Sequence, residues 1–179
     1  MTRVVEVSPE RFEDWLARFE ANNPDGPQRV VSVDRFDHAP VAVVLVRRGG
    51  YAVALADGLT LRAHKVGTRH VQSRTAAGGW SQQRFARRRD NQADQLVQAV
   101  QGHAARVLEG ARPRGLVLGG DPTLAAAVLE DARLRALESL PRRELFDIPD
   151  PRRAVLDAAL GRARAVRITI EDEPPHPVE

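Results

Sequence analysis

The chain has 179 residues, of which 42% are hydrophobic and 28% are charged. This length fits one domain with a full-sized core, and the composition is ordinary for a globular protein. The sequence has no cysteine, which excludes disulfides, thiolate metal sites and cysteine nucleophiles. No apolar run is long enough to cross a bilayer, and the N-terminus has no hydrophobic signal core. We therefore expect a cytoplasmic protein that does not bind a membrane.

Positive charge is concentrated in one segment of the chain. The net charge is +3, and all but one of the 27 basic residues are arginines, since Lys65 is the only lysine. Residues 58–89 contain eight basic residues and no acidic one, so the rest of the chain has a net charge of −5. Such a distribution suits docking on a polyanion through one face, although a solvated arginine face is the alternative for any charge run.

The first half of the sequence predicts a helix followed by antiparallel strands. Residues 3–7 alternate like a short edge strand, and the helix after Ser8-Pro9-Glu10 has an apolar face that we assign to the core: Phe12, Trp15, Leu16 and Phe19. Strands are predicted at 30–36, 41–47, 51–56 and 59–71, with Gly49-Gly50 and Asp57-Gly58 as hairpin turns. We expect these four strands to form an antiparallel meander.

The second half predicts a long helix and then alternating strands and helices. The helix covers residues 81–109, and its later part has an apolar stripe, whereas Arg84, Arg87, Arg88 and Asn91 share a face of its first turns. Its N-terminal end should therefore project beyond the core. Strands at 115–118, 143–148 and 166–170 are separated by helices, which implies parallel strands with helical crossovers. The predicted fold class is α/β, a mixed sheet with an antiparallel meander followed by strand–helix crossovers.

The predicted domain organisation is simple. Residues 1–170 are expected to form a single domain, in which residues 1–28 are a strand and helix extension. Residues 171–179 are acidic and proline-rich, so we expect a disordered tail.

Most catalytic motifs are missing from the sequence. The glycine turn in residues 115–121 lacks both a phosphate-loop lysine and the dinucleotide glycine spacing. The five histidines show no metal-binding spacing, so we expect no metal and no cofactor. A conventional hydrolase using His70 or Asp121 would need a closed pocket, and no nucleophile elbow supports one.

The segment that could carry chemistry is residues 74–83. Gly78 and Gly79 allow a close approach of the backbone to a ligand, and Ser81-Gln82-Gln83 begins a helix, where backbone amides attract negative charge. Arginines that can bind phosphates follow directly. A glutamine cannot act as a general acid or base at neutral pH, so it would position a water and donate a hydrogen bond to a developing oxyanion.

Residues 78–87, Gly-Gly-Trp-Ser-Gln-Gln-Arg-Phe-Ala-Arg, resemble the Gly-Gly-Gln loop and following helix of the middle domain of eukaryotic and archaeal class-one release factors. Residues 115–120, Gly-Leu-Val-Leu-Gly-Gly, are similar to a strand and glycine turn of that domain. The resemblance covers roughly residues 30–170 and is closest to the Vms-like release-factor branch, whose bacterial members are free-standing peptidyl-tRNA hydrolases. It implies a ribonuclease H-like fold and a peptidyl-tRNA hydrolase that acts on stalled ribosomes or large subunits.

The resemblance also implies roles for individual residues. Gly78 and Gly79 match the glycines of the catalytic loop. When the Arg-Phe-Ala-Arg segments are aligned without a gap, Trp80 occupies the position of the glutamine. A shift brings Gln82 to that role, with Gln83 as the second choice. Trp80 then either stacks on a ribosomal base or clamps the loop against the domain.

The partners implied by the resemblance are the ribosome, through large-subunit rRNA, and peptidyl-tRNA, and we expect a monomer. The residues expected to contact RNA are Arg74, Trp80, Arg84, Arg87, Arg88 and Arg89. The sequence shows no codon-reading domain, so we expect ribosome rescue rather than stop-codon recognition. The alternative is a non-catalytic ribosome- or RNA-binding module of the same fold, which would bind with a steep salt dependence but without turnover.

Overall fold

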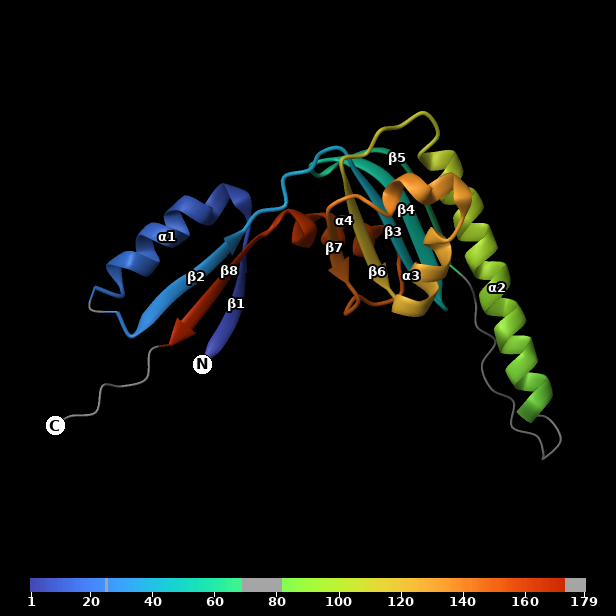
Figure 1. Cartoon of the computed structure of the whole chain (residues 1–179), viewed down its shortest axis with the longest axis horizontal. Coiled ribbons are helices and arrows are strands. Elements are labelled where there is room, and N and C mark those ends of the chain that lie inside the picture. The colour runs from blue at the N-terminus through green and yellow to red at the C-terminus, as the bar shows by residue number, and fades with distance from the viewer. Residues whose placement is uncertain (25, 69–81, 173–179) are drawn as a thin grey trace. The chain divides into compact units, whose positions relative to one another are not determined.

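The computed structural model describes residues 1–24, 26–68 and 82–172, the side chains of residues 82–85 excepted. The chain divides into two compact units (Figure 1). The central unit contains residues 38–160, and the terminal unit contains residues 1–37 together with the chain from residue 161 onward. The second boundary falls within helix α4 (Arg153–Arg164). Each unit is described by itself below.

The central unit is built on a five-stranded mixed sheet. Its strands are β3 (Val41–Arg47), β4 (Gly50–Asp57), β5 (Thr60–Thr68), β6 (Gly115–Gly120) and β7 (Arg142–Leu145). They follow the order β5-β4-β3-β6-β7. β3 is antiparallel to β4 and parallel to β6, and β7 is parallel to β6. The expected α/β class is therefore confirmed, with an antiparallel meander of three strands followed by two parallel strands.

The core of the central unit is centred on β3. Residues 41–46 are all buried, which is typical of a strand that is covered on both faces. One face packs against α2 (Gln82–Val107) and α3 (Pro122–Leu129), followed by the 3-10 helix η2 (Ala132–Leu137). The helix residues in that cluster include Leu96, Val100, Ala104, Leu124 and Val128.

The terminal unit is a three-stranded antiparallel sheet with one helix. Its elements are β1 (Thr2–Val7), the 3-10 helix η1 (Pro9–Arg11), α1 (Phe12–Ala21), β2 (Gln28–Asp34) and β8 (Val166–Asp172). β8 is the central strand, in the order β1-β8-β2. One face of the sheet packs against α1, with Phe12, Ile168 and Ile170 buried. β1 is an edge strand, as predicted.

Two strand placements predicted from the sequence are wrong. β2 was expected in the meander and pairs with β8 instead. β8 was expected as a parallel strand after a crossover, but it is antiparallel to both its neighbours. The alternating burial of β8 is typical of an antiparallel sheet with one covered face, whereas β3 is buried throughout. Burial on one face or on both thus separates the strands of the two sheets.

Other boundaries differ by a few residues. α2 agrees with the helix predicted at 81–109 within two residues, and β7 ends at Leu145, earlier than predicted. β8 continues to Asp172 because Glu171 pairs with Thr2 and Arg29, two residues into the segment predicted as a tail. Residues 69–71 of the predicted fifth strand and residues 173–179 lie outside the described part of the chain. The single domain over residues 1–170 stays a prediction.

The glycine turn after β6 has a structural role. A Cβ on Gly119 would lie 2.6 Å from the Leu145 carbonyl oxygen, and Gly120 has a φ of 97° and is placed so that a Cβ would meet the Val46 carbonyl. The Asp121 amide donates to that Val46 carbonyl at 2.8 Å. The Asp121 carboxylate then accepts hydrogen bonds from Thr123 and Leu124 and caps α3. The two glycines therefore let β6 pass close to its neighbours and enter α3.

Replacing Gly120 by alanine should destabilise the protein. The left-handed backbone costs roughly 1–3 kcal/mol for a residue with a Cβ, and the Val46 carbonyl adds a steric clash. The free energy of unfolding from urea titration measures the loss. Gly110→Ala is the matched control, because Gly110 has a φ of 70° but no atom within 4 Å of its Cβ position. Equal losses in the two variants would contradict the close packing at Gly120.

Candidate functional site

The predicted site residues lie around the start of α2. Arg74, Gly78, Gly79 and Trp80 fall outside the described residues. The backbone at Gln82, Gln83 and Arg84 forms the first turn of α2. Arg87, Arg88 and Arg89 follow in the same helix with exposed side chains. Within the described chain, the site is therefore represented by the N-terminal part of α2.

The N-terminal part of α2 projects from the central unit. Residues 86–92 are exposed at every position, and Leu96 is the first buried residue among those of the helix whose side chains are described. The helix rises 1.5 Å per residue, so Gln82 lies about 21 Å along the axis from Leu96. Figure 1 shows α2 extending past the edge of the sheet. The projection expected from the sequence is confirmed.

The three arginines after the first turn of α2 differ in the residues that neighbour them on the helix surface. Residues three, four and seven apart share one side of a helix. Arg89 lines up with Ala93 and Leu96, which pack on the core. Arg87 lines up with Asp90 and Asp94, whereas Arg88 lines up with polar uncharged residues: Asn91, Gln92 and Gln95. Of the three, only Arg88 is followed at these spacings by neither acidic nor apolar residues.

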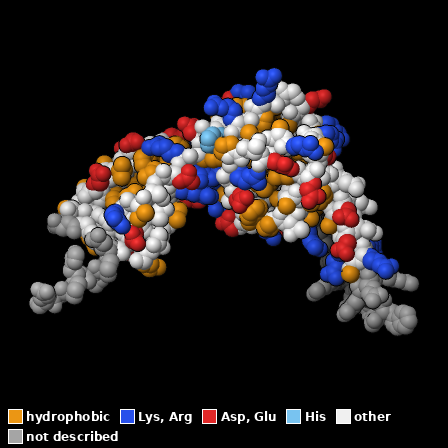
Figure 2. Space-filling view, viewed as in Figure 1, with side chains coloured by type: hydrophobic (Ala, Val, Ile, Leu, Met, Phe, Trp, Pro, Cys, Tyr) orange, Lys and Arg blue, Asp and Glu red, His pale blue; other side chains and the backbone are white. Residues whose placement is uncertain are grey.

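The charge of the projecting helix is therefore mixed. Residues 86–95 contain three arginines and two aspartates, and both blue and red side chains are visible in the arm that α2 forms in Figure 2. The charge count over residues 58–89 suggests a uniform basic surface around the helix. The structure does not show such a surface, because acidic side chains lie among the basic ones. On the side of Arg88, away from the residues of α2 that pack on the core, a phosphate would meet no nearby carboxylate of α2.

The buried part of α2 is fixed to the sheet by an aromatic pair that the sequence did not predict. The His103 ring stacks on Tyr51 of β4, with centroids 5.2 Å apart and planes at 11°. Gly67 of β5 leaves room for this arrangement, because a Cβ there would meet the Tyr51 ring. Burial raises the pKa of Tyr51 and lowers the pKa of His103, which nearby Arg106 and Lys65 lower further. The neutral imidazole is therefore favoured.

The basic segment predicted from the sequence is split in the fold. Arg62 pairs with Asp57 across the β4–β5 hairpin. Lys65 influences His103 together with Arg106, and His103 lies about 22 Å along the helix from Arg88, at 1.5 Å per residue. The described cations of residues 58–89 thus belong to separate places in the central unit. The spacing of these basic residues in the sequence did not indicate that the fold separates them.

Other kinds of site find little support in the described chain. No cluster of three or more potential metal ligands occurs in the described residues. Within residues 1–24, 26–68 and 82–172, no helix is long and apolar enough to cross a membrane. Asp121 is engaged as the N-cap of α3, which leaves it a structural role, and His70 lies outside the described residues.

The sequence matches the Actinobacteria/chloroflexi VLRF1 release factor family over residues 39–169, well over half of the chain. The protein belongs to this family. The resemblance to a Vms-like release factor is thereby confirmed, and with it a role in translation termination or ribosome rescue that involves the ribosome. A comparison with curated proteins gave no match. The matched range includes most of β8 and the whole central unit apart from its first residue, His38. It leaves β1, α1 and β2 outside.

The His103–Tyr51 stack should make stability depend on pH. The pKa of His103 is lowered in the folded state from its usual value of 6.5, so the unfolded chain takes up this proton first. The stabilisation is present above about pH 6.5 and is lost as the pH falls through the lower folded-state pKa. When urea unfolding is measured at pH 7.5 and at pH 5.5, the free energy of unfolding should fall less between these two pH values in His103→Phe than in the wild type. An equal fall in the free energy of unfolding in both proteins would contradict the assignment of this pH dependence to His103.

Proposed function

We propose that the protein is a peptidyl-tRNA hydrolase that releases nascent chains from stalled ribosomes or large subunits. The observation that carries this proposal is the combination of the release-factor family with a helix whose backbone extends about 21 Å beyond the buried residue Leu96. Residues 74–81, including the Gly78-Gly79 pair, directly precede this helix in the chain. A projecting helix suits delivery of a short segment into a narrow RNA cavity.

The proposed reaction is hydrolysis of the ester between the peptide and the tRNA. The oxygen of a water forms a bond with the ester carbonyl carbon, the bond from that carbon to the ribose oxygen breaks, and a proton from the water passes to the ribose oxygen. Gln82 would orient this water and donate a hydrogen bond from its side-chain amide to the developing oxyanion, which the flanking backbone amides would also stabilise. Gln83 is the second candidate for this role.

RNA binding is proposed for the arginines around the reactive segment. Arginine binds phosphate through paired hydrogen bonds. Arg88 is the strongest candidate among the described residues, because its side of α2 has no acidic neighbour at the spacings given above. Arg74, Arg84, Arg87, Arg89 and Trp80 are further candidates, with Trp80 stacking on a base. The proposed partners are large-subunit rRNA and peptidyl-tRNA. We also propose that the protein is a monomer and acts in the cytoplasm, where the ribosomes are.

A second function keeps the ribosome as partner but lacks catalysis. One observation favours it: without a gap before Arg84-Phe85-Ala86-Arg87, Trp80 falls where class-one release factors have glutamine. In that case the protein would associate with ribosomes and leave peptidyl-tRNA intact.

Substitution of the glutamines separates the two functions. Purified protein should release peptide from a stalled ribosome complex, and Gln82→Ala should reduce the release rate by roughly two to three orders of magnitude, the usual effect of removing one oxyanion donor. Cosedimentation with ribosomes should be unchanged, which is the control for binding. Normal release by both Gln82→Ala and Gln83→Ala would exclude the mechanism, and ribosome binding without release by the wild type would favour the non-catalytic module.

The three described arginines of α2 provide an internal comparison. Arg87→Gln, Arg88→Gln and Arg89→Gln remove the same charge from neighbouring positions of one helix. Arg88→Gln should weaken ribosome binding most and reduce the slope of log K against log salt by roughly 0.7–0.9, the value for one phosphate contact. Equal effects of the three variants would contradict the separate sides of the helix. Arg135→Gln, an exposed arginine of η2, controls for the loss of one charge elsewhere.

A further inference from the structure

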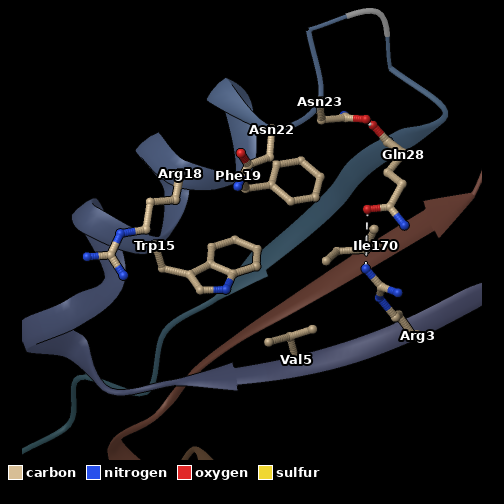
Figure 3. A pocket seen from close by; sticks show the side chains of 9 residues that line it. All are labelled: Arg3, Val5, Trp15, Arg18, Phe19, Asn22, Asn23, Gln28 and Ile170. Carbon is tan, nitrogen blue, oxygen red and sulfur yellow. Dashed lines mark hydrogen bonds between the residues drawn. The ribbon is translucent and has the colours of Figure 1, made fainter.

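The terminal unit contains a cavity that the release-factor role does not explain. It has a volume of about 290 Å³ and lies between α1 and the strands β1, β2 and β8. Figure 3 shows Trp15 and Phe19 pointing from the helix toward the sheet, with Val5 and Ile170 below them. The remaining residues around it are Arg3, Arg18, Asn22, Asn23 and Gln28. Most of these residues lie before the range matched by the family.

The charge of the lining is positive. Two arginines, Arg3 and Arg18, line the cavity, and none of the residues that line it is acidic. Both arginines are exposed, so their guanidinium groups are accessible from solvent. An anionic ligand, and a phosphate in particular, is therefore favoured over a cation or a neutral molecule.

One wall of the cavity is aromatic. The rings of Trp15 and Phe19 are stacked, with centroids 5.3 Å apart and planes at 16°. Both side chains remain partly exposed, although the sequence pattern assigned them to the core. A partly exposed indole above an apolar floor of Val5 and Ile170 can stack on a planar ligand, and nucleobases are the most common planar groups attached to phosphate.

Amide side chains supply hydrogen bonds at the edge of the cavity. Asn23 donates to the Gln28 carbonyl oxygen at 2.6 Å. The Gln28 side chain donates to Asp172 at 2.9 Å and accepts from Arg3 at 3.3 Å, as the dashed line to Arg3 in Figure 3 shows. Gln28 thus orients Arg3 beside the cavity. Asn22 is exposed at its rim, where its amide can both donate to and accept from a base edge.

We propose that this cavity binds one nucleotide of single-stranded RNA, with the base against Trp15 and the phosphate on Arg18 and Arg3. The volume is at the small end of the range for ligand sites, roughly 300–1,000 Å³, which suits a single nucleotide and excludes a duplex. The choice of RNA also rests on the ribosome as the partner of this family. An acidic peptide shares the negative charge but lacks a base to stack on the indole.

The fluorescence of Trp15 reports directly on this site. The sequence has only two tryptophans, Trp15 and Trp80, so in the full-length Trp80→Phe variant all tryptophan emission comes from Trp15. Addition of a short unstructured RNA oligonucleotide should quench this emission in a saturable way, and adenosine monophosphate should do so at higher concentration. A peptide of glutamates with the same charge should leave it unchanged. Saturable quenching by the peptide, or none by the RNA, would overturn the proposal.

Two exposed positions test the site without disturbing the core. In the Trp80→Phe background, Arg18→Gln and Asn22→Ala should each weaken RNA binding at least about fivefold, as expected for lost hydrogen bonds to a charged or polar ligand. Arg29→Gln is the matched control: it removes the same charge from the same unit, but Arg29 pairs with Glu171 and does not line the cavity. Equal weakening by Arg29→Gln would indicate nonspecific charge attraction and overturn the site.

The result of the Trp15 fluorescence experiment does not depend on whether the protein releases peptide. Quenching is measured without ribosomes, so it can succeed when the Gln82 and Gln83 variants release peptide normally. Conversely, loss of release in those variants together with no quenching would leave the hydrolase intact and remove only this cavity as an RNA site.

Discussion

The burial of one side of α2, beginning only at Leu96, is the constraint on which the proposed activity depends. From Leu96 onward the helix is held by apolar contacts with the sheet and α3, and by the stack of His103 on Tyr51. Before Leu96 no residue of α2 with a described side chain is buried, so hydrogen bonds within the helix must maintain the projecting turns. Because an isolated helix this short is marginal in water, the buried part also serves as the nucleus that keeps the exposed part helical.

Much of the central unit could be predicted from the sequence, because its signals are local. The hairpins at Gly49-Gly50 and Asp57-Gly58, the long helix and the strand before Gly119-Gly120 all follow from turn residues and apolar spacing. The distribution of β2 and β8 between two sheets could not be predicted, since pairing over more than 130 residues leaves no local pattern. The two strands differ physically in that β8 is buried on one face and β3 on both faces. The sequence indicates this difference only weakly, because both strands consist largely of similar apolar residues.

The candidate site was predicted in a similarly uneven way. The chemistry proposed for it rests on residues 78–87, whose resemblance to release factors agrees with the family match. The separation of Arg87, Arg88 and Arg89 around the helix also follows from their spacing, once the side that packs on the core is known. By contrast, the pairing of Arg62 with Asp57 and the cavity beside Trp15 depend on contacts between different strands and helices. Trp15 and Phe19 fit a core pattern, and that pattern gives no indication that the sheet below them leaves part of each ring open.

The position of β8 has a consequence for the order in which the protein is made. The sheet of the central unit needs residues 41–145, whereas the terminal unit needs β8 between β1 and β2, and β8 ends at Asp172. During synthesis β1 and α1 leave the exit tunnel before the central unit, yet their sheet lacks its middle strand until β8, more than 150 residues after β1, has been added. The terminal unit is therefore the last part to assemble. A chain cut short after β7 would contain the five-stranded sheet but leave the apolar face of α1 without its main cover.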